Sequence, residues 1–533
     1  MRKIILTLLR HSMPGLLLCL TACLNETPHD QIAETEAYTN ATDLYLNTIG
    51  NLYLQIGSNQ ESQGLQGTYR GVYDFNTFTT DEAMIPIRGG DWYDGGFWQR
   101  LYLHTWTPAD EALYNTWKYL YKAVGLSNHA LATITRHKDL LTPAQYDEYM
   151  AEARGLRALF YFYIMDMWGN IPLSMTDGTE ANNALQTPRK EVAETLIHEL
   201  QAAVPYLSPA HSNLQGRNYG RFTQPVAYFL LCKILLNNQV YMGPGTHLFT
   251  VDGVQMNAFE ACIAYCQKIT AAGYTLSADY KQNFAVHNET SNENIFTIPM
   301  DKHLYANEYQ YFFRSRHYRH GDALGMASEN GTCATVATVN AYGYGTPNED
   351  KRFAMNFYSG TVRVDGQVVR LSNGQPLVYE PLAARISLTG SPYEKTAGAR
   401  MAKYEVDRTA YSDGRLIDND IVLFRYADVL LMQAEALVRN GQNGDTEMNL
   451  VRQRVGMPPR QATLDNLLQE RLLELMWEGW RRNDLVRFGK FQQAYDFRLP
   501  IAGESTGFTC LFPIPKNAIK LSPTPLQQNP GYH

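Results

Sequence analysis

The sequence predicts a mainly α-helical protein in which pairs of helices support long irregular loops. Apolar residues recur at helical spacing in several segments, and short connections join these segments as in helical hairpins. Two long stretches between them are rich in Gly, Asn, Tyr and Thr and lack a helical period. Because no fixed-period repeat is visible, the spacing alone does not establish a helical-repeat architecture.

The N-terminus has the layout of a bacterial lipoprotein signal peptide. Residues 2 and 3 are basic, residues 4–20 are mostly apolar, and a pair of small residues stands directly before Cys23. We expect residues 1–22 to be removed and the thiol of Cys23 to be acylated, which would tether the mature chain to a membrane. A plain secretory cleavage signal is the alternative. No later segment has enough consecutive apolar residues to span a membrane.

Helix signals follow in order along the chain. Residues 28–67 are predicted to form a linker that leads into a first helix near residues 43–56. The clearest start is at Thr142, where a proline follows and Gln145 completes a capping box. That helix is expected to end at Trp168, before a Gly-Asn-Ile-Pro stop. Further amphipathic helices are predicted over residues 188–204, 224–237, 258–272, 421–439 and 464–480.

The irregular stretches cover residues 57–106 and 305–415. Within the second, residues 362–370 alternate around an Asp-Gly pair, which predicts a β-hairpin. Loops that rest on rigid elements commonly carry binding residues. We therefore expect the function of this protein to reside on these two stretches.

The strongest candidate for ligand binding is the segment 88–98, which places four aromatic side chains beside two carboxylates and an arginine. Aromatic rings stack on the apolar faces of sugars, while charged groups bond to sugar hydroxyls. The alternative is a hydrophobic cluster beneath a loop. A second aromatic stretch, residues 305–318, is expected to contribute for the same reason. The predicted ligand-binding residues are Arg88, Asp91, Trp92, Tyr93, Asp94, Trp98, Tyr309 and Tyr311.

Several classes of function are not supported. The net charge is −7 and no Lys/Arg-rich run is present, which argues against nucleic acid as a partner. The common hydrolase, zinc-protease and nucleotide-binding motifs are absent, so we predict no catalytic residue and no cofactor. The segment 418–420 offers carboxylates for a structural calcium ion, but the EF-hand spacing is missing.

Cys262 and Cys266 stand one helical turn apart. The sequence shows no nearby His or Cys that would complete a metal site around them. We therefore predict no metal site and interpret both as small buried apolar side chains.

Glu470, Glu474 and Glu478 repeat at helical spacing and would repel one another if left alone. Catalytic carboxylate pairs face each other across a cleft and do not stack along one helix. We therefore interpret this row as structural. It is expected to pair with arginines of neighbouring helices, with Arg154, Arg157 and Arg425 as the candidates.

Several short motifs follow one another along almost the whole chain. They are Leu-Thr-Ala-Cys at residues 20–23, residues 153–163, Trp168-Gly-Asn-Ile-Pro-Leu, residues 424–436, 449–456 and 474–487, Phe512-Pro-Ile-Pro, and Gln528-Asn-Pro-Gly-Tyr. Each motif alone is weak, but together and in this order they make the chain resemble the SusD/RagB family of outer-membrane nutrient-binding lipoproteins of Bacteroidetes.

The resemblance implies tetratricopeptide-like helix pairs, an α/α superhelix, that support an irregular ligand lobe with small β-hairpins. It also implies one domain over residues 23–533, with an N-terminal part of about 23–220 and a C-terminal part of about 280–533. The expected role is non-catalytic capture of a glycan at the cell surface for a SusC-like TonB-dependent transporter of the outer membrane. In starch-binding members an arc of aromatic residues holds the glycan, and its two limbs correspond to residues 92–98 and 305–331 here.

Two other functions remain open at this stage. A RagB-like lipoprotein would bind peptides for a peptide transporter. A surface glycoside hydrolase would use a carboxylate pair such as Asp91 and Asp94, which are flanked by tryptophans.

Overall fold

The computed structural model describes residues 37–178 and 183–533. The predicted signal peptide and Cys23 lie outside the described residues. Within the described part, no helix is both long enough and apolar enough to cross a membrane.

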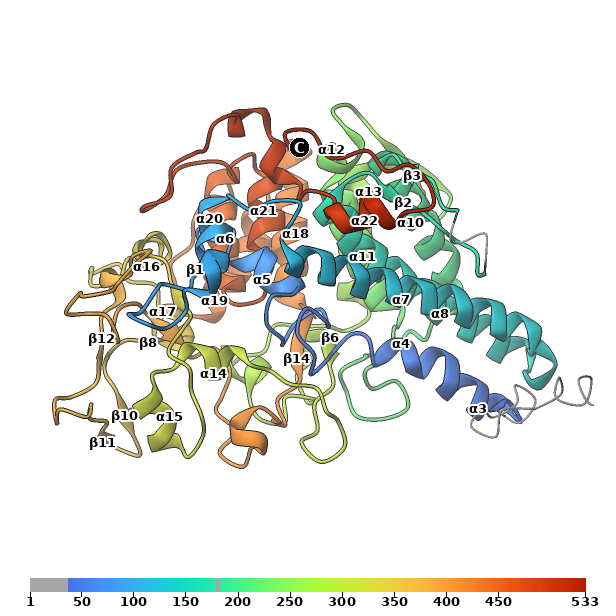
Figure 1. Ribbon diagram of the computed structural model, residues 1–533. Coiled ribbons are helices and arrows are strands. Elements are labelled where there is room, and N and C mark those ends of the chain that lie inside the picture. Colours follow the sequence, from blue (N-terminus) through green and yellow to red (C-terminus); the bar gives the residue numbers. More distant parts are fainter. Residues whose placement is uncertain (1–36, 179–182) are drawn as a thin grey trace, which may run out of the picture.

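A scaffold of helices packs largely in chain order, and each helix contacts the next. The contacting pairs are α7–α8, α8–α10, α10–α11, α11–α13, α13–α18, α18–α19 and α18–α20. Figure 1 shows α7 and α8 as the longest members, on the right of the molecule. The bounds are α7 Glu111–Arg136, α8 Pro143–Trp168, α10 Arg189–Ala203, α11 Gln224–Leu236, α13 Ala258–Ala271, α18 Tyr426–Arg439, α19 Asp445–Arg454 and α20 Leu464–Leu475.

The predicted capping box at Thr142 is confirmed. The Thr142 hydroxyl accepts a hydrogen bond from the Gln145 amide, and the Gln145 side chain accepts one from the Thr142 amide. The helix ends at Trp168 because Gly169 follows with a φ of 77°. The helices predicted near residues 188, 224 and 258 also occur, each within a residue or so of its expected bounds. Helix α7 was not among the helices predicted from the sequence.

Two predicted helices differ from the structure. Residues 421–425 form strand β14, which pairs with β6 Asn294–Ile298, so α18 begins only at Tyr426. The run Ile-Val-Leu-Phe-Arg is buried along its whole length, and such short apolar runs fit strands and helices alike. The last predicted helix ends at Leu475, where the chain turns through Trp477 with a φ of 67° before α21 Arg481–Arg487.

The first predicted helix is also irregular. Residues 41–53 comprise α3 Ala41–Tyr45, one turn of π-helix over Leu46–Gly50, and α4 Asn51–Tyr53. Further short helices lie in the loops and near the C-terminus: α5 Val72–Thr77, α6 Phe97–Leu103, α12 Asn238–Met242, α14 Tyr311–Ser315, α15 Tyr318–Leu324, α16 Val336–Ala341, α17 Arg352–Asn356 and α22 Lys516–Leu521.

All sheets in the described part are two-stranded and antiparallel. The predicted hairpin is confirmed, because β10 Arg363–Val364 pairs with β11 Gln367–Val368 across a turn whose two residues have positive φ. The other pairs are β1 Ala83–Met84 with β7 Cys333–Ala334, β2 Ile171–Pro172 with β3 Gln186–Thr187, β4 Leu248–Val251 with β5 Val254–Asn257, β8 Phe357–Tyr358 with β13 Arg400–Met401, and β9 Gly360–Thr361 with β12 Val378–Tyr379.

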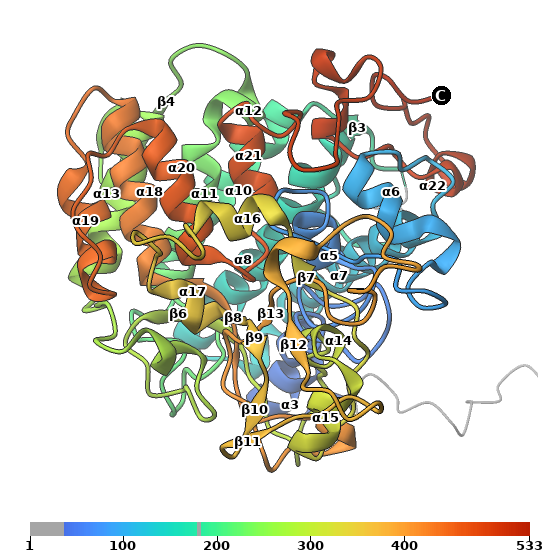
Figure 2. The same ribbon diagram turned by 90° about the vertical axis from the view of Figure 1, so that its left-hand side faces the viewer.

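The two irregular stretches meet and form one lobe. Strand β1 of the first stretch pairs with β7 of the second. Arg314 binds Asp74 through both guanidinium NH groups, and both side chains are fully buried. In Figure 1 the part of the lobe from α14 to α17 and β8 to β12 lies on the left and lower left, and Figure 2 shows α14, α15 and β8 to β12 below the scaffold helices α18 and α20.

The row of glutamates is structural, as predicted, and lies in a buried cluster of charges. Arg425 bonds to Glu474 at 2.6 Å and to Glu478 at 2.7 Å. The predicted pairing with α8 is wrong, because Arg157 instead binds Glu199 on α10. The remaining cations around the row are Arg352, Lys403, Arg452 and Arg454.

The cysteines at 262 and 266 are buried in α13, as predicted. The expectation that no other cysteine lies near them is wrong. Because α11 packs against α13, it brings Cys232 to the same point in the core, 30 residues away from Cys262 in the sequence.

The acidic segment 418–420 is engaged by protein groups. Asp418 pairs with Lys302 at 2.6 Å. Asp420 accepts hydrogen bonds from the Tyr219 hydroxyl and from the Met300 amide.

Candidate ligand-binding site

A surface hollow of about 450 Å³ lies where the two irregular stretches meet. It combines aromatic rings with carboxylates and one guanidinium group, which is the composition expected of a site for a polar ligand with apolar faces. Its lining residues are Tyr69, Arg70, Gly90, Asp91, Trp92, Asp94, Trp98, Tyr318 and Glu329.

The loop that presents Trp92 has an unusual backbone. A small antiparallel bridge between Arg88 and Asp91 closes a tight turn. Trp92 then has a φ of 66° and Asp94 a φ of 44°, in a region that bulky residues rarely occupy. Such conformations persist where the surroundings hold them, and they concentrate at functional sites. The loop ends in two glycines that lead into α6.

Two contacts from the second stretch fix the Trp92 ring. Its indole N–H donates to the Glu329 carbonyl oxygen at 2.9 Å. Gly331 lies directly against the ring, since a Cβ at that position would be only 2.6 Å from Trp92 Cε2. The ring also meets Trp98 edge-on, with centroids 6.0 Å apart. These contacts hold Trp92 in one orientation, and the residue remains partly exposed.

Paired charged groups surround the hollow. Asp94 accepts a hydrogen bond from the Trp98 indole at 2.7 Å and pairs with Arg70 at 3.0 Å. Asp91 accepts from the Tyr318 hydroxyl at 2.9 Å and from Lys395 at 3.1 Å. Burial opposes ionisation of Asp91, but these two hydrogen bonds lower its pKa below the ordinary value. Both aspartates can accept further hydrogen bonds from a ligand.

A third acid lies deeper in the hollow. The Glu329 carboxyl accepts a short hydrogen bond from the Tyr69 hydroxyl. Burial raises the pKa of Glu329, although that hydrogen bond works in the opposite direction.

The structure brings most of the predicted residues of segment 88–98 together, but in different roles. Trp92, Asp91 and Asp94 line the hollow, and Tyr93 is 59% exposed beside them. Trp98 also lines it, although this residue is almost fully buried, with 1% exposed. Arg88 is fully buried and donates to three carbonyl oxygens, so it supports the loop and does not face a ligand.

The predicted contribution of Tyr309 and Tyr311 does not agree with the structure. Both are buried, at 0% and 2% exposure, and Tyr311 stacks on Tyr73 with the ring centroids 3.9 Å apart. Aromatic residues in an irregular stretch serve equally well as core, and spacing does not distinguish the two uses. The aromatic side chain that the second stretch supplies to the hollow is Tyr318, which is 40% exposed.

Sequence reasoning also missed Tyr69, Arg70 and Glu329. Each stands in one of the two irregular stretches named from composition, but no motif or spacing marks it. Folding within the first stretch brings Tyr69 and Arg70 to the hollow, and only the pairing of the two stretches brings Glu329 there.

A second hollow, of about 460 Å³, lies on the scaffold beside α7. It also has aromatic walls, but the hydroxyls of Tyr121 and Tyr161 are bonded to backbone carbonyls, and no carboxylate lines it. Because the hollow at Trp92 combines aromatic rings with carboxylates and a guanidinium group, we take it as the candidate site.

Helices stacked in chain order that carry a loop-built lobe define the class of proteins with a tetratricopeptide-like helical fold. Within that class, the model of the SusD family matches residues 251–532, which is more than half of the chain. A model described as "Starch-binding associating with outer membrane" matches residues 63–236. The chain belongs to the SusD family.

Two relatives match this chain over most of their length. The starch-binding protein SusD of Bacteroides thetaiotaomicron is 23% identical over 524 residues, which cover 89% of this chain and 87% of that protein. A SusD-like protein of Bacteroides ovatus is 22% identical over 437 residues, which cover 79% and 74% of the two chains.

Solved structures share the fold. Surface glycan-binding protein A from Bacteroides thetaiotaomicron in complex with laminarihexaose has a TM-score of 0.71 at 20% identity, covering 92% of this chain and 100% of that one. The corresponding protein from Bacteroides fluxus has a TM-score of 0.70 at 19% identity, covering 93% and 100%.

Proposed function

We propose that this protein captures a glycan at the outer surface of the cell and passes it, without chemical change, to a SusC-like TonB-dependent transporter. The observation that carries the proposal is the partly exposed Trp92 ring, held between two stretches of chain and bordered by Asp91 and Asp94. Membership of the SusD family supports it, as do relatives named for starch and laminarin binding. Cys23 supplies the lipid anchor to the outer membrane.

The geometry suits a sugar ring. Trp92 offers a flat face in a fixed orientation, so little conformational entropy is lost when a ring stacks on it. Asp91 and Asp94 accept hydrogen bonds from hydroxyls, and Arg70 donates them. Tyr318 adds a second ring to the hollow, and the exposed Tyr93 extends the aromatic surface beyond it.

The ion pairs of Asp91 and Asp94 and the pKa of Asp91 support binding without hydrolysis. Each already has a cationic partner, and the pKa of Asp91 is lowered, whereas a general acid needs a raised pKa. Glu329 has a raised pKa, which makes it the residue on which a hydrolase would depend. Incubation with oligosaccharides distinguishes the two: we expect depletion of ligand without new reducing ends, and new reducing ends that disappear in Glu329→Gln would favour the hydrolase.

The peptide-binding alternative is tested by exposing the protein to a glycan array and to a peptide pool side by side. We expect retention of glycans. Retention of peptides alone would contradict the proposal and support a RagB-like role.

The site itself is tested with Trp92→Ala and the glycan that the array selects. Loss of a stacking aromatic at a hot spot costs about 2 kcal/mol or more, so affinity should fall roughly thirtyfold. Tyr206→Ala, which removes an aromatic residue that is 52% exposed on the scaffold, is the matched control and should leave affinity unchanged. Equal calorimetric affinities for Trp92→Ala and wild type, with both folded, would place the site elsewhere.

A further inference from the structure

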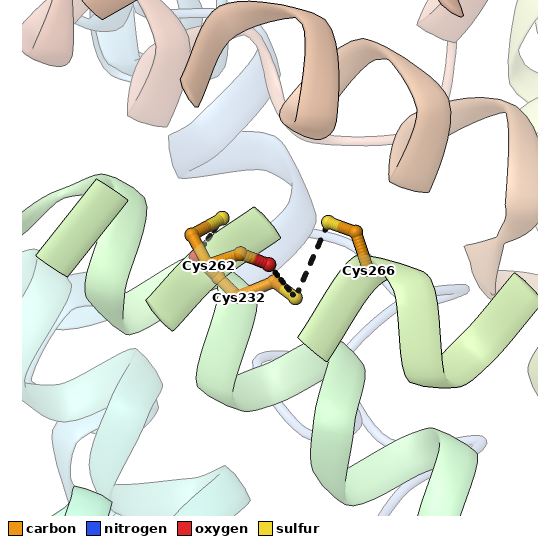
Figure 3. A group of neighbouring side chains, drawn as sticks. All are labelled: Cys232, Cys262 and Cys266. Carbon is orange, nitrogen blue, oxygen red and sulfur yellow. Dashed lines mark hydrogen bonds between the residues drawn. The ribbon is translucent and has the colours of Figure 1, made fainter. Parts of the chain in front are cut away.

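Three buried cysteines form a cluster that the proposed glycan site does not use. Cys232 lies on α11, and Cys262 and Cys266 lie one turn apart on α13. None of the three is exposed to solvent. Figure 3 shows their side chains gathered in the space between the two helices.

The sulfur atoms are spaced as in a three-coordinate thiolate site. All three Sγ atoms lie within 4.8 Å of one another, and those of Cys232 and Cys266 are 3.5 Å apart. A metal–thiolate bond of about 2.3 Å in a trigonal plane places the sulfurs roughly 4 Å from one another. The observed spacing therefore needs only small side-chain shifts to close around one ion.

The ligand set consists of sulfur alone. In the part of the chain that the structure describes, the group contains no His and no carboxylate. The nearest acids on α18 are already paired, Glu435 with Arg487 at 2.7 Å and Asp428 with Lys233 at 2.6 Å. Neither of these two carboxylates is therefore free to act as a fourth ligand.

The number and type of ligands select the ion. Calcium and magnesium require oxygen ligands, and structural zinc sites are almost always completed by four. Soft thiolates favour Cu(I). We propose that Cys232, Cys262 and Cys266 bind a single Cu(I) ion that joins α11 to α13.

The burial of the three cysteines determines how a copper ion can reach them. Since no thiol is exposed, the ion must enter while the chain folds or while α11 and α13 separate. An ion held by the folded chain also stabilises it, because binding to the native state shifts the folding equilibrium. Copper should thus be acquired during refolding and should raise the melting temperature.

The test uses the mature chain with Cys23→Ser, so that the anchor position adds no thiol. The chain is unfolded, refolded without oxygen in the presence of Cu(I), and washed with a Cu(I) chelator. We expect one copper ion per chain, an absorption spectrum with thiolate-to-Cu(I) charge transfer, and X-ray absorption fitted by three sulfur neighbours. The melting temperature should exceed that of protein refolded without copper.

Cys232→Ala, Cys262→Ala and Cys266→Ala should each lose the copper and the copper-dependent rise in melting temperature. Cys333→Ala and Cys510→Ala, which remove cysteines outside the cluster, should behave like the parent chain. Circular dichroism shows whether each variant folds, and three separate variants keep the test valid if one does not. Absence of retained copper in the parent chain, equal retention in all variants, or a Cys232–Cys266 disulfide in the exported protein would overturn the proposal.

Discussion

Trp92 has a backbone conformation that a bulky residue rarely adopts. A bulky residue with a φ of 66° carries strain on the order of 1–3 kcal/mol, which the surrounding contacts must offset. One of those contacts is the hydrogen bond to the Glu329 carbonyl. The other is the close packing of the ring on Gly331, which is possible because Gly331 has no side chain. At the residue scale, the orientation of Trp92 thus depends on a glycine that does not itself line the hollow.

We predict that Gly331→Ala weakens glycan binding. The new methyl group would lie 2.6 Å from the Trp92 ring, so the ring must move and present a different face. Displacement of a positioned aromatic should reduce affinity about tenfold, which corresponds to about 1.4 kcal/mol. Calorimetry with the selected glycan measures the loss.

The control for that prediction is Gly125→Ala, because Gly125 is exposed on α7 and a Cβ there meets open space. This variant should bind like wild type and gain up to about 1 kcal/mol of stability from helix propensity. If both glycine variants bind equally well, Gly331 has no positioning role.

At the scale of elements, a buried cluster of charges joins α20 to β14. Glu474 is fully buried with Arg352, Arg425 and Arg454 around it. Burial alone would raise its pKa, but the three guanidinium groups hold the pKa well below its usual range. These carboxylate–guanidinium contacts fix where α20 lies against the strand.

We predict that Glu474→Gln and Arg425→Met each destabilise the fold by about 3–5 kcal/mol, because each change leaves buried partner charges uncompensated. Glycan affinity of the folded fraction should be unchanged. Urea denaturation and calorimetry measure the two quantities. Glu194→Gln, which breaks an exposed pair with Lys190, is the control and should cost under about 1 kcal/mol. A loss of binding without destabilisation would move the glutamate row into the site.

Glu82, which bonds to the turn after α20, makes the stability of the fold depend on pH. Its carboxylate accepts a hydrogen bond from the Trp477 amide at 2.5 Å, and burial raises its pKa to about 8. The unfolded chain has an ordinary pKa of about 4.3, so between these values the native state holds more protons. The stability contributed by Glu82 is therefore complete below about pH 4.3 and is lost as the pH rises toward 8.

We predict that Glu82→Gln becomes more stable relative to wild type as the pH rises. The difference between the two unfolding free energies should shift in favour of the variant by more than about 1 kcal/mol from pH 5 to 8.5, since one pKa unit corresponds to about 1.4 kcal/mol. Urea midpoints at both pH values provide the measurement, with the surface variant Glu194→Gln as the control. Parallel curves for wild type and Glu82→Gln would contradict the assignment.

At the scale of the whole molecule, two stretches far apart in the chain complete one lobe on a helical scaffold. Asp91 and Tyr318 lie 227 positions apart, and Trp92 and Glu329 lie 237 apart, yet each pair is joined by a hydrogen bond. The scaffold holds both stretches in place, so the site belongs to the whole chain.

We predict that Cys23→Ala releases the protein from the outer membrane. Without the thiol no lipid can be attached, and one such anchor is the only membrane contact that the sequence suggests. Membrane fractionation and detergent partitioning of the variant provide the measurement. Cys510→Ala is the control, and it should remain in the outer-membrane fraction. Membrane retention of Cys23→Ala would refute acylation at this residue.

The sequence by itself determined the elements whose signals are local. Thr142 and Gln145 set the start of α8 because a capping box involves residues only three positions apart. The same holds for the hairpin at residues 363–368, where the turn residues determine the pairing. The segment around Trp92 could also be named in advance, since its composition is unusual over eleven residues.

Only the tertiary structure decided which aromatic residues face the ligand and which fill the core. Tyr311 and Tyr318 stand in the same aromatic stretch, yet one stacks in the core and the other lines the hollow. Likewise, only the packing of α11 on α13 brings Cys232 to Cys266. A local sequence pattern predicts only what depends on residues close together in the chain, such as a helix start or a turn. Burial and long-range contacts depend on how distant segments pack, and no local spacing encodes that.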